Sequence, residues 1–193
     1  RRRRLPKRLS RDEVAALLAA PDTSTWRGLR DRAMLEVTYR AGLRVSEVVK
    51  LRPGDVDMET GAVHVWNGKG GVDRTSYLDP GRVRESLGDW MNARERLGAR
   101  DDDPIFCRED LGGLSTRAIQ YLVREYKDVA GITTACTPHV LRHTFASELL
   151  EEGFSTRSVQ ELLGHASVAT TEVYLHISES KLAEQVRARA VVP

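Results

Sequence analysis

The spacing of hydrophobic residues along the chain is mostly helical, with apolar positions recurring every three or four residues. Residues 10–20 give the first example, because Ser10 and Glu13 form a capping-box pattern ahead of Val14, Leu17 and Leu18. The same reasoning predicts further helices over 27–40, 80–97, 115–129, 137–150, 155–163 and 179–190, and short helices after Arg44 and Ser167. Glycines close behind three of these stretches, at 42, 131 and 164, are typical of helix ends.

Only short segments have the alternating pattern of β-strands. Residues 62–66 and 74–78 carry β-formers, and between them lies Asn67–Gly71, a glycine-rich stretch that predicts a hairpin loop with Lys69 at its tip. Ile105 and Phe106 are a third strand candidate. The chain is therefore expected to fold as an α+β domain that is mostly helical, with a small antiparallel β-sheet.

At 193 residues, the chain can hold one sizeable hydrophobic core. It is 40% hydrophobic and 30% charged, which is ordinary for a water-soluble protein, and no apolar run approaches the roughly 18 residues of a membrane span. No signal peptide is visible, and Cys107 and Cys136 stand alone without metal-binding spacing. We therefore expect a cytoplasmic protein with no membrane partner.

Charge is distributed unevenly. The formal net charge is +2, but seven of the 30 basic residues and no acidic residue lie within residues 1–11. From Asp12 onward, 23 basic residues face 28 acidic ones, a net charge of −5. Bulk charge thus does not predict nucleic-acid binding, and any DNA contact would need a local basic surface. The first four arginines fit either a solvated arm or a contact with a nucleic-acid backbone.

The helix predicted to begin at Thr137 carries the most suggestive chemistry. Thr137 is a good N-cap, Pro138 suits the first helical position, and His139, Arg142 and His143 then fall on one face. A helix N-terminus favours anions, and an arginine fork fits phosphate oxygens, so this face predicts a phosphate site beside a proton-transfer residue. A hydrogen-bonded core histidine and a surface arginine would give the same pattern. The apolar stripe expected to face the core lies roughly opposite, at Leu141, Phe145 and Leu149.

Further candidates stand at element ends or in loops. Arg44 and Glu47 are three residues apart, which also fits a surface ion pair worth roughly a few tenths of a kcal/mol. Lys69 is either a solvated turn lysine or a mobile lysine delivered to a substrate; the loop is not a phosphate-binding P-loop, which would need serine or threonine in place of Gly70. His165 stands directly after a helix-ending glycine.

Together, these residues could perform phosphoryl transfer without a metal ion. Two arginines can neutralise a phosphodiester and the added charge of a pentavalent transition state. A tyrosine can act as a covalent nucleophile, a histidine as an acid–base group near neutral pH, and a lysine as a proton donor to a leaving oxygen. The candidate residues are Arg44, Lys69, His139, Arg142, His165 and Tyr174.

Four sequence boxes, in order and with matching gaps, resemble the tyrosine recombinase (phage integrase) family. They are Ala-Gly-Leu-Arg-Val-Ser-Glu at 41–47, Gly-Lys-Gly at 68–70, His-Val-Leu-Arg-His at 139–143, and Leu-Gly-His at 163–165 with Tyr174 nine residues on. Residues 5–10 are similar to the usual opening of the family's catalytic domain. The resemblance implies a tyrosine-recombinase catalytic domain over essentially the whole chain. The short tail after Tyr174 is similar to that of compact Xer-type members, although phage and mobile-element integrases share the same boxes.

The resemblance implies a role for each matching residue. Arg44 and Arg142 would hold the scissile phosphate. Tyr174 would attack it, giving a 3′-phosphotyrosyl DNA intermediate and a free 5′-hydroxyl, and Lys69 would protonate that leaving oxygen.

The remaining matches imply supporting roles, with no cofactor and no metal. His139 would be the acid–base partner, and His165 would hydrogen-bond a phosphate oxygen. Glu47 would orient the cationic groups from behind. His143 is not one of the family's core catalytic residues and is expected to be a supporting or core histidine.

The resemblance also divides the chain into three parts and implies its partners. Residues 1–9 would be a linker or tail from a missing N-terminal core-binding domain, 10–177 the catalytic domain, and 178–193 a C-terminal helix and tail. Leu182, Val186 and Ala190 form a narrow stripe on that helix, which fits either the chain's own core or a groove on a neighbouring subunit. The implied partners are double-stranded DNA and further recombinase subunits, in a homo- or hetero-tetramer on DNA.

Other classes of protein explain less of the sequence. A zinc hydrolase is suggested by His139 and His143, but its helical motif needs glutamate where Val140 stands. A catalytically silent DNA-binding module would leave Tyr174 and His165 unexplained. A DNA-relaxing type IB topoisomerase shares the chemistry and is the nearest alternative, because rejoining to the original or to a partner strand depends on assembly.

Overall fold

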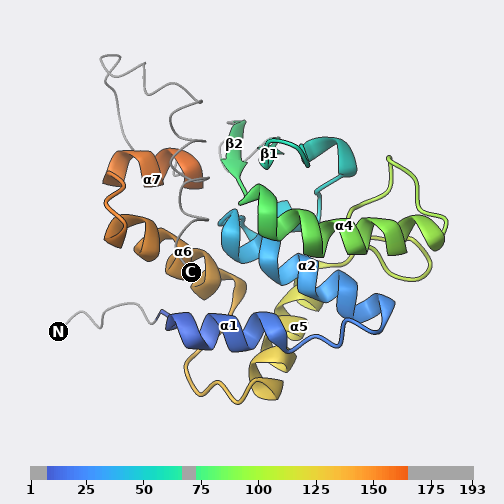
Figure 1. The fold of residues 1–193 in the computed structure, drawn as a ribbon, viewed down its shortest axis with the longest axis horizontal. Coiled ribbons are helices and arrows are strands. Elements are labelled where there is room, and N and C mark those ends of the chain that lie inside the picture. The colour runs from blue at the N-terminus through green and yellow to red at the C-terminus, as the bar shows by residue number, and fades with distance from the viewer. Residues whose placement is uncertain (1–7, 67–72, 165–193) are drawn as a thin grey trace.

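The computed structural model describes residues 8–66 and 73–164, except for the side chains at positions 80, 82 and 83. Within these ranges, a two-stranded antiparallel sheet lies among helices (Figure 1), which confirms the predicted fold class. No helix in this part of the chain is both long and apolar enough to cross a membrane. The elements are α1 (Arg11–Ala19), α2 (Trp26–Arg40), α3 (Val45–Val48), the 3₁₀ helix η1 (Pro53–Asp55), β1 (Ala62–Val65), β2 (Arg74–Tyr77), α4 (Pro80–Arg96), α5 (Thr116–Val129), α6 (Pro138–Glu151) and α7 (Thr156–Leu163).

The helices begin where the capping residues of the sequence place them. At α1, the Ser10 hydroxyl accepts a hydrogen bond from the Glu13 N–H, and the Glu13 carboxylate accepts one from the Ser10 N–H. Ser115, Thr137 and Ser155 cap α5, α6 and α7 in the same way, each accepting from the amide three residues on. Such a cap typically contributes about 1 kcal/mol. Within the described residues, the predicted and observed helix starts therefore agree within about one residue. The helices predicted after Ser167 and over 179–190, and the hairpin loop predicted at 67–71, lie outside the described residues.

The hairpin has one face in the core and one face outside. β1 and β2 pair antiparallel with Val63 opposite Ser76 and Val65 opposite Arg74. Val63 and Val65 are buried, whereas His64 between them is half-buried and lies on the outer face. Because side chains alternate along a strand, the register places Arg74 on the inner face of the sheet.

The hydrophobic core is organised around α2, of whose 15 residues ten are buried. α4 lies alongside α2, α6 packs against it from another direction, and α1 and α5 contact each other beside it (Figure 1). The stripe on α6 is fully buried as predicted, at Leu141, Phe145 and Leu149. α7 packs against both α6 and β2, so it reaches the edge of the hairpin.

The prediction of a strand at Ile105 and Phe106 was wrong. These two residues are buried at 1% and 0% exposure, but they pair with loops and side chains instead of a strand. The Ile105 N–H donates to the Leu51 carbonyl (2.8 Å), and the Ile105 carbonyl accepts from Nε1 of Trp90 (2.9 Å). The isolated bridge in this region is between Cys107 and Gly113. A short apolar segment can thus be buried and hydrogen-bonded without belonging to a sheet.

Candidate active site

Arg44 is positioned by the tight turn that links α2 to α3. Gly42 in this turn has a φ of +57°, and a Cβ there would lie 2.5 Å from Cδ1 of Phe145, so the turn requires glycine. Arg44 follows as the N-cap residue of α3. Its backbone N–H donates to Oε2 of Glu47 (2.7 Å) and its Nη1 donates to Oε1 (2.8 Å). The Arg44 and Glu47 side chains are only 24% and 8% exposed, so this is a semi-buried pair and not a solvated surface pair.

Arg142 lies in the second turn of α6 and is also buried, with 6% exposure. Its Nη1 donates to the carbonyl of Gly42 and its Nη2 to the carbonyl of Leu163. The face of α6 predicted to be reactive is therefore covered here by the α2–α3 turn and by the end of α7. Burial, together with the positive charge of Arg44, lowers the pKa of Arg142 to about 10. At neutral pH the guanidinium stays charged.

Arg74 is the residue of this cluster that sequence reasoning missed. Its Nη1 and Nη2 donate to the two carboxylate oxygens of Glu47 at 2.8 and 2.7 Å, in a bidentate pair, and its Nε donates to the carbonyl of Leu162 (3.1 Å). The side chain is 6% exposed. One signal was available: the alternation of the predicted strand turns this arginine inward with Ser76, and an inward arginine needs a carboxylate partner.

Glu47 is the carboxylate that joins two of these arginines. Burial alone would raise its pKa, but hydrogen bonds from Arg74 and from the Arg44 backbone N–H outweigh burial and hold the pKa below its usual value. Glu47 is therefore ionised at neutral pH. Three arginines around one carboxylate leave this cluster with an excess of positive charge, which suits an anionic ligand.

The three arginines converge on the C-terminal end of α7. Arg74 donates to the carbonyl of Leu162, Arg142 to that of Leu163, and Nη2 of Arg44 to that of Gly164 (2.8 Å). The last carbonyls of a helix lack helical partners and carry partial negative charge, so they attract cations. Gly164 is the residue directly before His165 in the chain.

The other predicted site residues are less fully defined. His139 is exposed in the first turn of α6 and makes no hydrogen bond with another described residue, whereas His143 is half-buried. Lys69, His165 and Tyr174 lie outside the described residues. Among the residues that are described, no three His, Cys, Asp or Glu side chains are grouped as a metal site would require.

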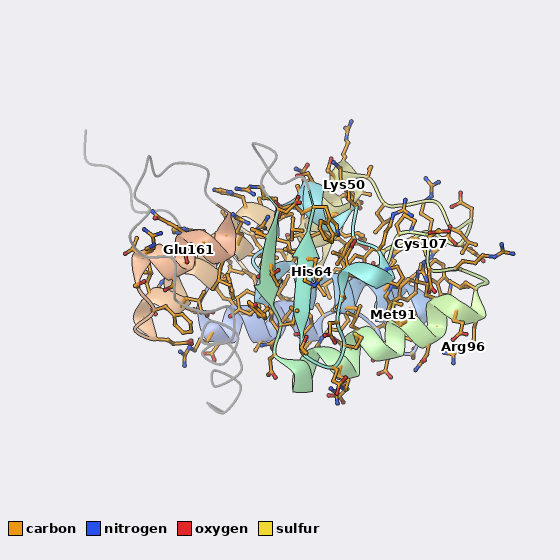
Figure 2. The ribbon with its side chains drawn as sticks, turned by 90° about the horizontal axis from the view of Figure 1, so that it is seen from above. Lys50, His64, Met91, Arg96, Cys107 and Glu161 are labelled. Carbon is orange, nitrogen blue, oxygen red and sulfur yellow. The ribbon has the colours of Figure 1, made fainter. Side chains whose placement is uncertain are left out.

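A groove of about 490 Å³ opens beside Arg44. It is lined by the basic Lys50 and Arg52, by the acidic Glu47 and Asp55, and by the outer face of the hairpin. Figure 2 shows His64 on this face, with α7, which carries Glu161, beside the hairpin. Trp66 at the end of the face is 58% exposed, stacks with His64 at a ring separation of 5.9 Å, and donates from Nε1 to Asp55 (2.6 Å). The groove thus combines basic side chains with an anchored, exposed indole.

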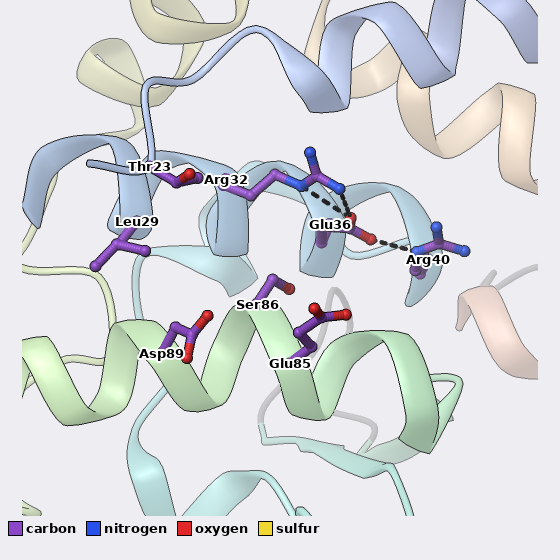
Figure 3. Close-up of a pocket in the computed structure, with 8 residues that line it drawn as sticks. All are labelled: Thr23, Leu29, Arg32, Glu36, Arg40, Glu85, Ser86 and Asp89. Atoms are coloured by element: carbon purple, nitrogen blue, oxygen red, sulfur yellow. Dashed lines mark hydrogen bonds and ion pairs between the residues drawn. The ribbon is translucent and has the colours of Figure 1, made fainter. Parts of the chain in front are cut away.

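A second hollow, of about 480 Å³, lies between α2 and α4 (Figure 3). Its α2 wall is an ion ladder in which Glu36 pairs with Arg32 on one side and with Arg40 on the other. Glu85 and Asp89 line the facing wall on α4. Three acidic residues, Glu36, Glu85 and Asp89, outnumber the two arginines in this hollow, which opposes the binding of an anion. We therefore place the candidate active site at the arginine cluster beside α7.

Comparisons with known proteins identify the family of the chain. Residues 7–181 match the phage integrase family. The chain is 43% identical to a tyrosine recombinase XerD from Ralstonia nicotianae over 93% of its own length and 58% of that protein. It is 36% identical to a tyrosine recombinase XerC from Vibrio cholerae, over 95% of its own length and 58% of that protein. The chain therefore spans about three fifths of the length of these relatives.

Solved structures give the same picture. The crystal structure of XerA recombinase matches with a TM-score of 0.75 and 34% identity, over 98% of this chain and 65% of that one. A post-cleavage complex of XerH site-specific recombinase with its palindromic difH substrate matches with a TM-score of 0.75 and 27% identity, over 99% of this chain and 54% of that one. Together with the family match over most of the sequence, these similarities show that the chain belongs to the phage integrase family, as a Xer-like tyrosine recombinase domain.

Proposed function

We propose that the chain is the catalytic domain of a site-specific DNA recombinase that cleaves and rejoins strands through a 3′-phosphotyrosyl intermediate. The observation that carries the proposal is the arginine cluster at the end of α7. Arg44 and Arg142 come from distant parts of the sequence, and both donate to adjacent carbonyls of residues 163 and 164. Their two guanidinium groups are therefore neighbours, as recognition of a single phosphate requires.

In the proposed reaction, Arg44 and Arg142 bind the non-bridging oxygens of the scissile phosphate. The Tyr174 hydroxyl forms a bond to phosphorus while the bond to the 5′-oxygen breaks. His139 accepts the tyrosine proton, and Lys69 donates a proton to the leaving 5′-oxygen, so charge and protons balance.

His165 completes the proposed site by hydrogen-bonding a phosphate oxygen, and the reverse of these steps rejoins the strand. A low-dielectric site with two fixed guanidinium groups strengthens the stabilisation of the transition-state charge.

Double-stranded DNA is the proposed substrate, and the groove beside Arg44 supports this choice. Lys50 and Arg52 can neutralise phosphates that flank the scissile one, and the exposed face of Trp66 can pack on a sugar or base. The overall charge of the chain does not favour DNA, so this local surface matters. We further propose that residues 10–177 form the catalytic unit in the cytoplasm, and that residues 178–193 contact a neighbouring subunit in a homo- or hetero-tetramer on DNA.

The proposed function is tested by trapping the covalent intermediate. A duplex with a nick next to the scissile phosphate loses the short 5′-hydroxyl fragment after cleavage, so the attached protein cannot religate and accumulates on a denaturing gel. We expect an adduct at a 3′-phosphate, and we expect it to form equally well in EDTA because arginine and lysine supply the positive charge. Genomic fragments serve as substrate for the full-length protein when the target site is unknown. Failure to find any adduct, or an adduct that needs Mg²⁺, would contradict the proposal.

Lys69→Ala is expected to slow adduct formation by about 10²–10⁴-fold, the usual range for the loss of a general acid. A substrate with sulfur in place of the bridging 5′-oxygen should recover most of this loss, because a thiolate leaves without a proton. Rates on the oxygen and sulfur substrates are measured side by side for both proteins. Equal slowing on the two substrates would assign Lys69 to phosphate binding instead.

A further inference from the structure

Arg74 differs from Arg44 and Arg142 in the acceptors of its guanidinium N–H groups. Both terminal nitrogens of Arg74 are matched to the two oxygens of Glu47, at 2.8 and 2.7 Å. The terminal nitrogens of Arg142 instead face backbone carbonyls, and Arg44 shares its two between Glu47 and a carbonyl. An arginine whose fork is filled by a carboxylate is poorly placed to bind a phosphate as well.

Arg74 nevertheless contacts the groups that hold both phosphate-binding arginines. Through Glu47 it shares a carboxylate with Arg44, since Oε1 of Glu47 accepts from both side chains. Through its Nε it holds the carbonyl of Leu162, and the next carbonyl, that of Leu163, accepts from Arg142. The buried side chain of Arg74 thus holds in place Glu47, which pairs with Arg44, and the end of α7, whose backbone accepts from Arg142.

Gly164, at the C-terminal end of α7, also packs on Arg74. Gly164 has a φ of +62°, and a Cβ at this position would lie 2.6 Å from Cδ of Arg74, so the backbone passes directly over the arginine stem. The carbonyl of Gly164 accepts from Arg44. Gly164, the residue before His165 in the chain, is therefore packed on Arg74 and hydrogen-bonded to Arg44.

We infer that Arg74 is a positioning residue of the recombinase reaction. It orients Arg44 through Glu47 and Arg142 through the end of α7, and it touches no DNA itself. The inference rests on the proposed function, because it assigns Arg44 and Arg142 to the scissile phosphate. Lysine cannot replace Arg74, because an ammonium cannot span both oxygens of Glu47 and reach the Leu162 carbonyl at the same time.

The test measures adduct formation at saturating nicked DNA for the wild type, Arg74→Ala and Arg74→Lys, with rates expressed per folded molecule. We expect both variants to be slower by about 10²-fold, since small misplacements of groups around a reacting centre have effects of this size. DNA affinity should change far less than the rate. Arg108→Ala, which removes an exposed ion pair with Asp110, is the matched control and should keep the wild-type rate.

A double-mutant cycle with Glu47→Gln separates positioning from direct phosphate contact. If Arg74 acts partly through Glu47, the Arg74→Ala change should cost less in the Glu47→Gln background than in the wild type, because the link through Glu47 is already broken and only the link to the end of α7 remains. Losses that multiply fully would mean that Arg74 acts independently of Glu47, which overturns the inference.

Two further outcomes keep the inference separable from the proposed function. A wild-type rate per folded molecule in Arg74→Lys, with a lower melting temperature only, would show that Arg74 merely stabilises the fold. If the wild type itself forms no adduct, the proposed function is overturned, and the inference about Arg74 falls with it.

Discussion

Tyr174→Phe is expected to abolish covalent attachment to DNA while leaving DNA affinity within about twofold, because phosphate contacts dominate affinity. Phenylalanine keeps the ring but has no oxygen to attack phosphorus, so no slower route to the same bond remains. The wild type and the variant are incubated with the nicked duplex, and attached protein is counted on a denaturing gel. DNA binding is measured separately on an intact duplex, so that loss of binding is distinguished from loss of chemistry.

The other tyrosines provide the matched control for this experiment. Tyr121 is 66% exposed and is the sterically accessible rival among the described tyrosines, so Tyr121→Phe should form the adduct at the wild-type rate. Tyr126 is a poor rival, because burial and the neighbouring Asp31 carboxylate, which accepts a hydrogen bond from the Tyr126 hydroxyl (2.8 Å), raise the pKa of Tyr126. Tyr39 is buried and donates to Glu148. An adduct that persists in Tyr174→Phe and disappears in Tyr121→Phe would identify Tyr121 on α5 as the nucleophile and would contradict the proposed role of Tyr174.

Local signals were sufficient to predict most of the fold. The capping residues and apolar spacing placed the observed helices within about a residue of their starts, and the glycine at 164 closes α7 in the left-handed conformation as expected. These features depend on neighbours along the chain. The error at Ile105 and Phe106 has the opposite origin, because their hydrogen bonds go to Leu51, Leu114 and the side chain of Trp90. Such partners cannot be identified from an apolar dipeptide.

Only part of the candidate site could be predicted, and the reason is the same: local contacts follow from sequence spacing, but contacts between remote segments do not. The spacing of Arg44 and Glu47 suggested their pairing, which is local, and the structure shows it. Arg74 enters the cluster only because the hairpin register turns it inward and α7 packs on β2. The burial of Arg142 likewise depends on two distant segments, the turn at Gly42 and the end of α7. Contacts between remote segments are what sequence spacing leaves undetermined.

Arg142→Ala is expected to slow adduct formation by about 10³–10⁵-fold, the range found when an arginine that stabilises a phosphoryl-transfer transition state is lost. A sulfur at the bridging 5′ position should not restore the rate, because the missing interaction is with the non-bridging oxygens. A methylphosphonate, in which a methyl group replaces one charged oxygen, should instead narrow the gap between variant and wild type, since less negative charge needs stabilising. The three substrates therefore give opposite patterns for Arg142→Ala and Lys69→Ala.

Because Arg142 is buried, Arg142→Ala is also expected to change the stability of the fold, and this effect must be separated from the effect on catalysis. Removing the side chain leaves the carbonyls of Gly42 and Leu163 without this donor, at a cost of about 1–3 kcal/mol for each unsatisfied group. It also removes a buried charge that the folded protein disfavours, as the pKa of about 10 indicates, so the two effects oppose each other. In the wild type, a phosphate bound at the cluster would contact the charged Arg142 guanidinium, and the variant lacks this contact, so DNA should raise the melting temperature more for the wild type than for Arg142→Ala. Equal stabilisation of both proteins by DNA, with an unchanged cleavage rate, would show that Arg142 only holds the α2–α3 turn against α7.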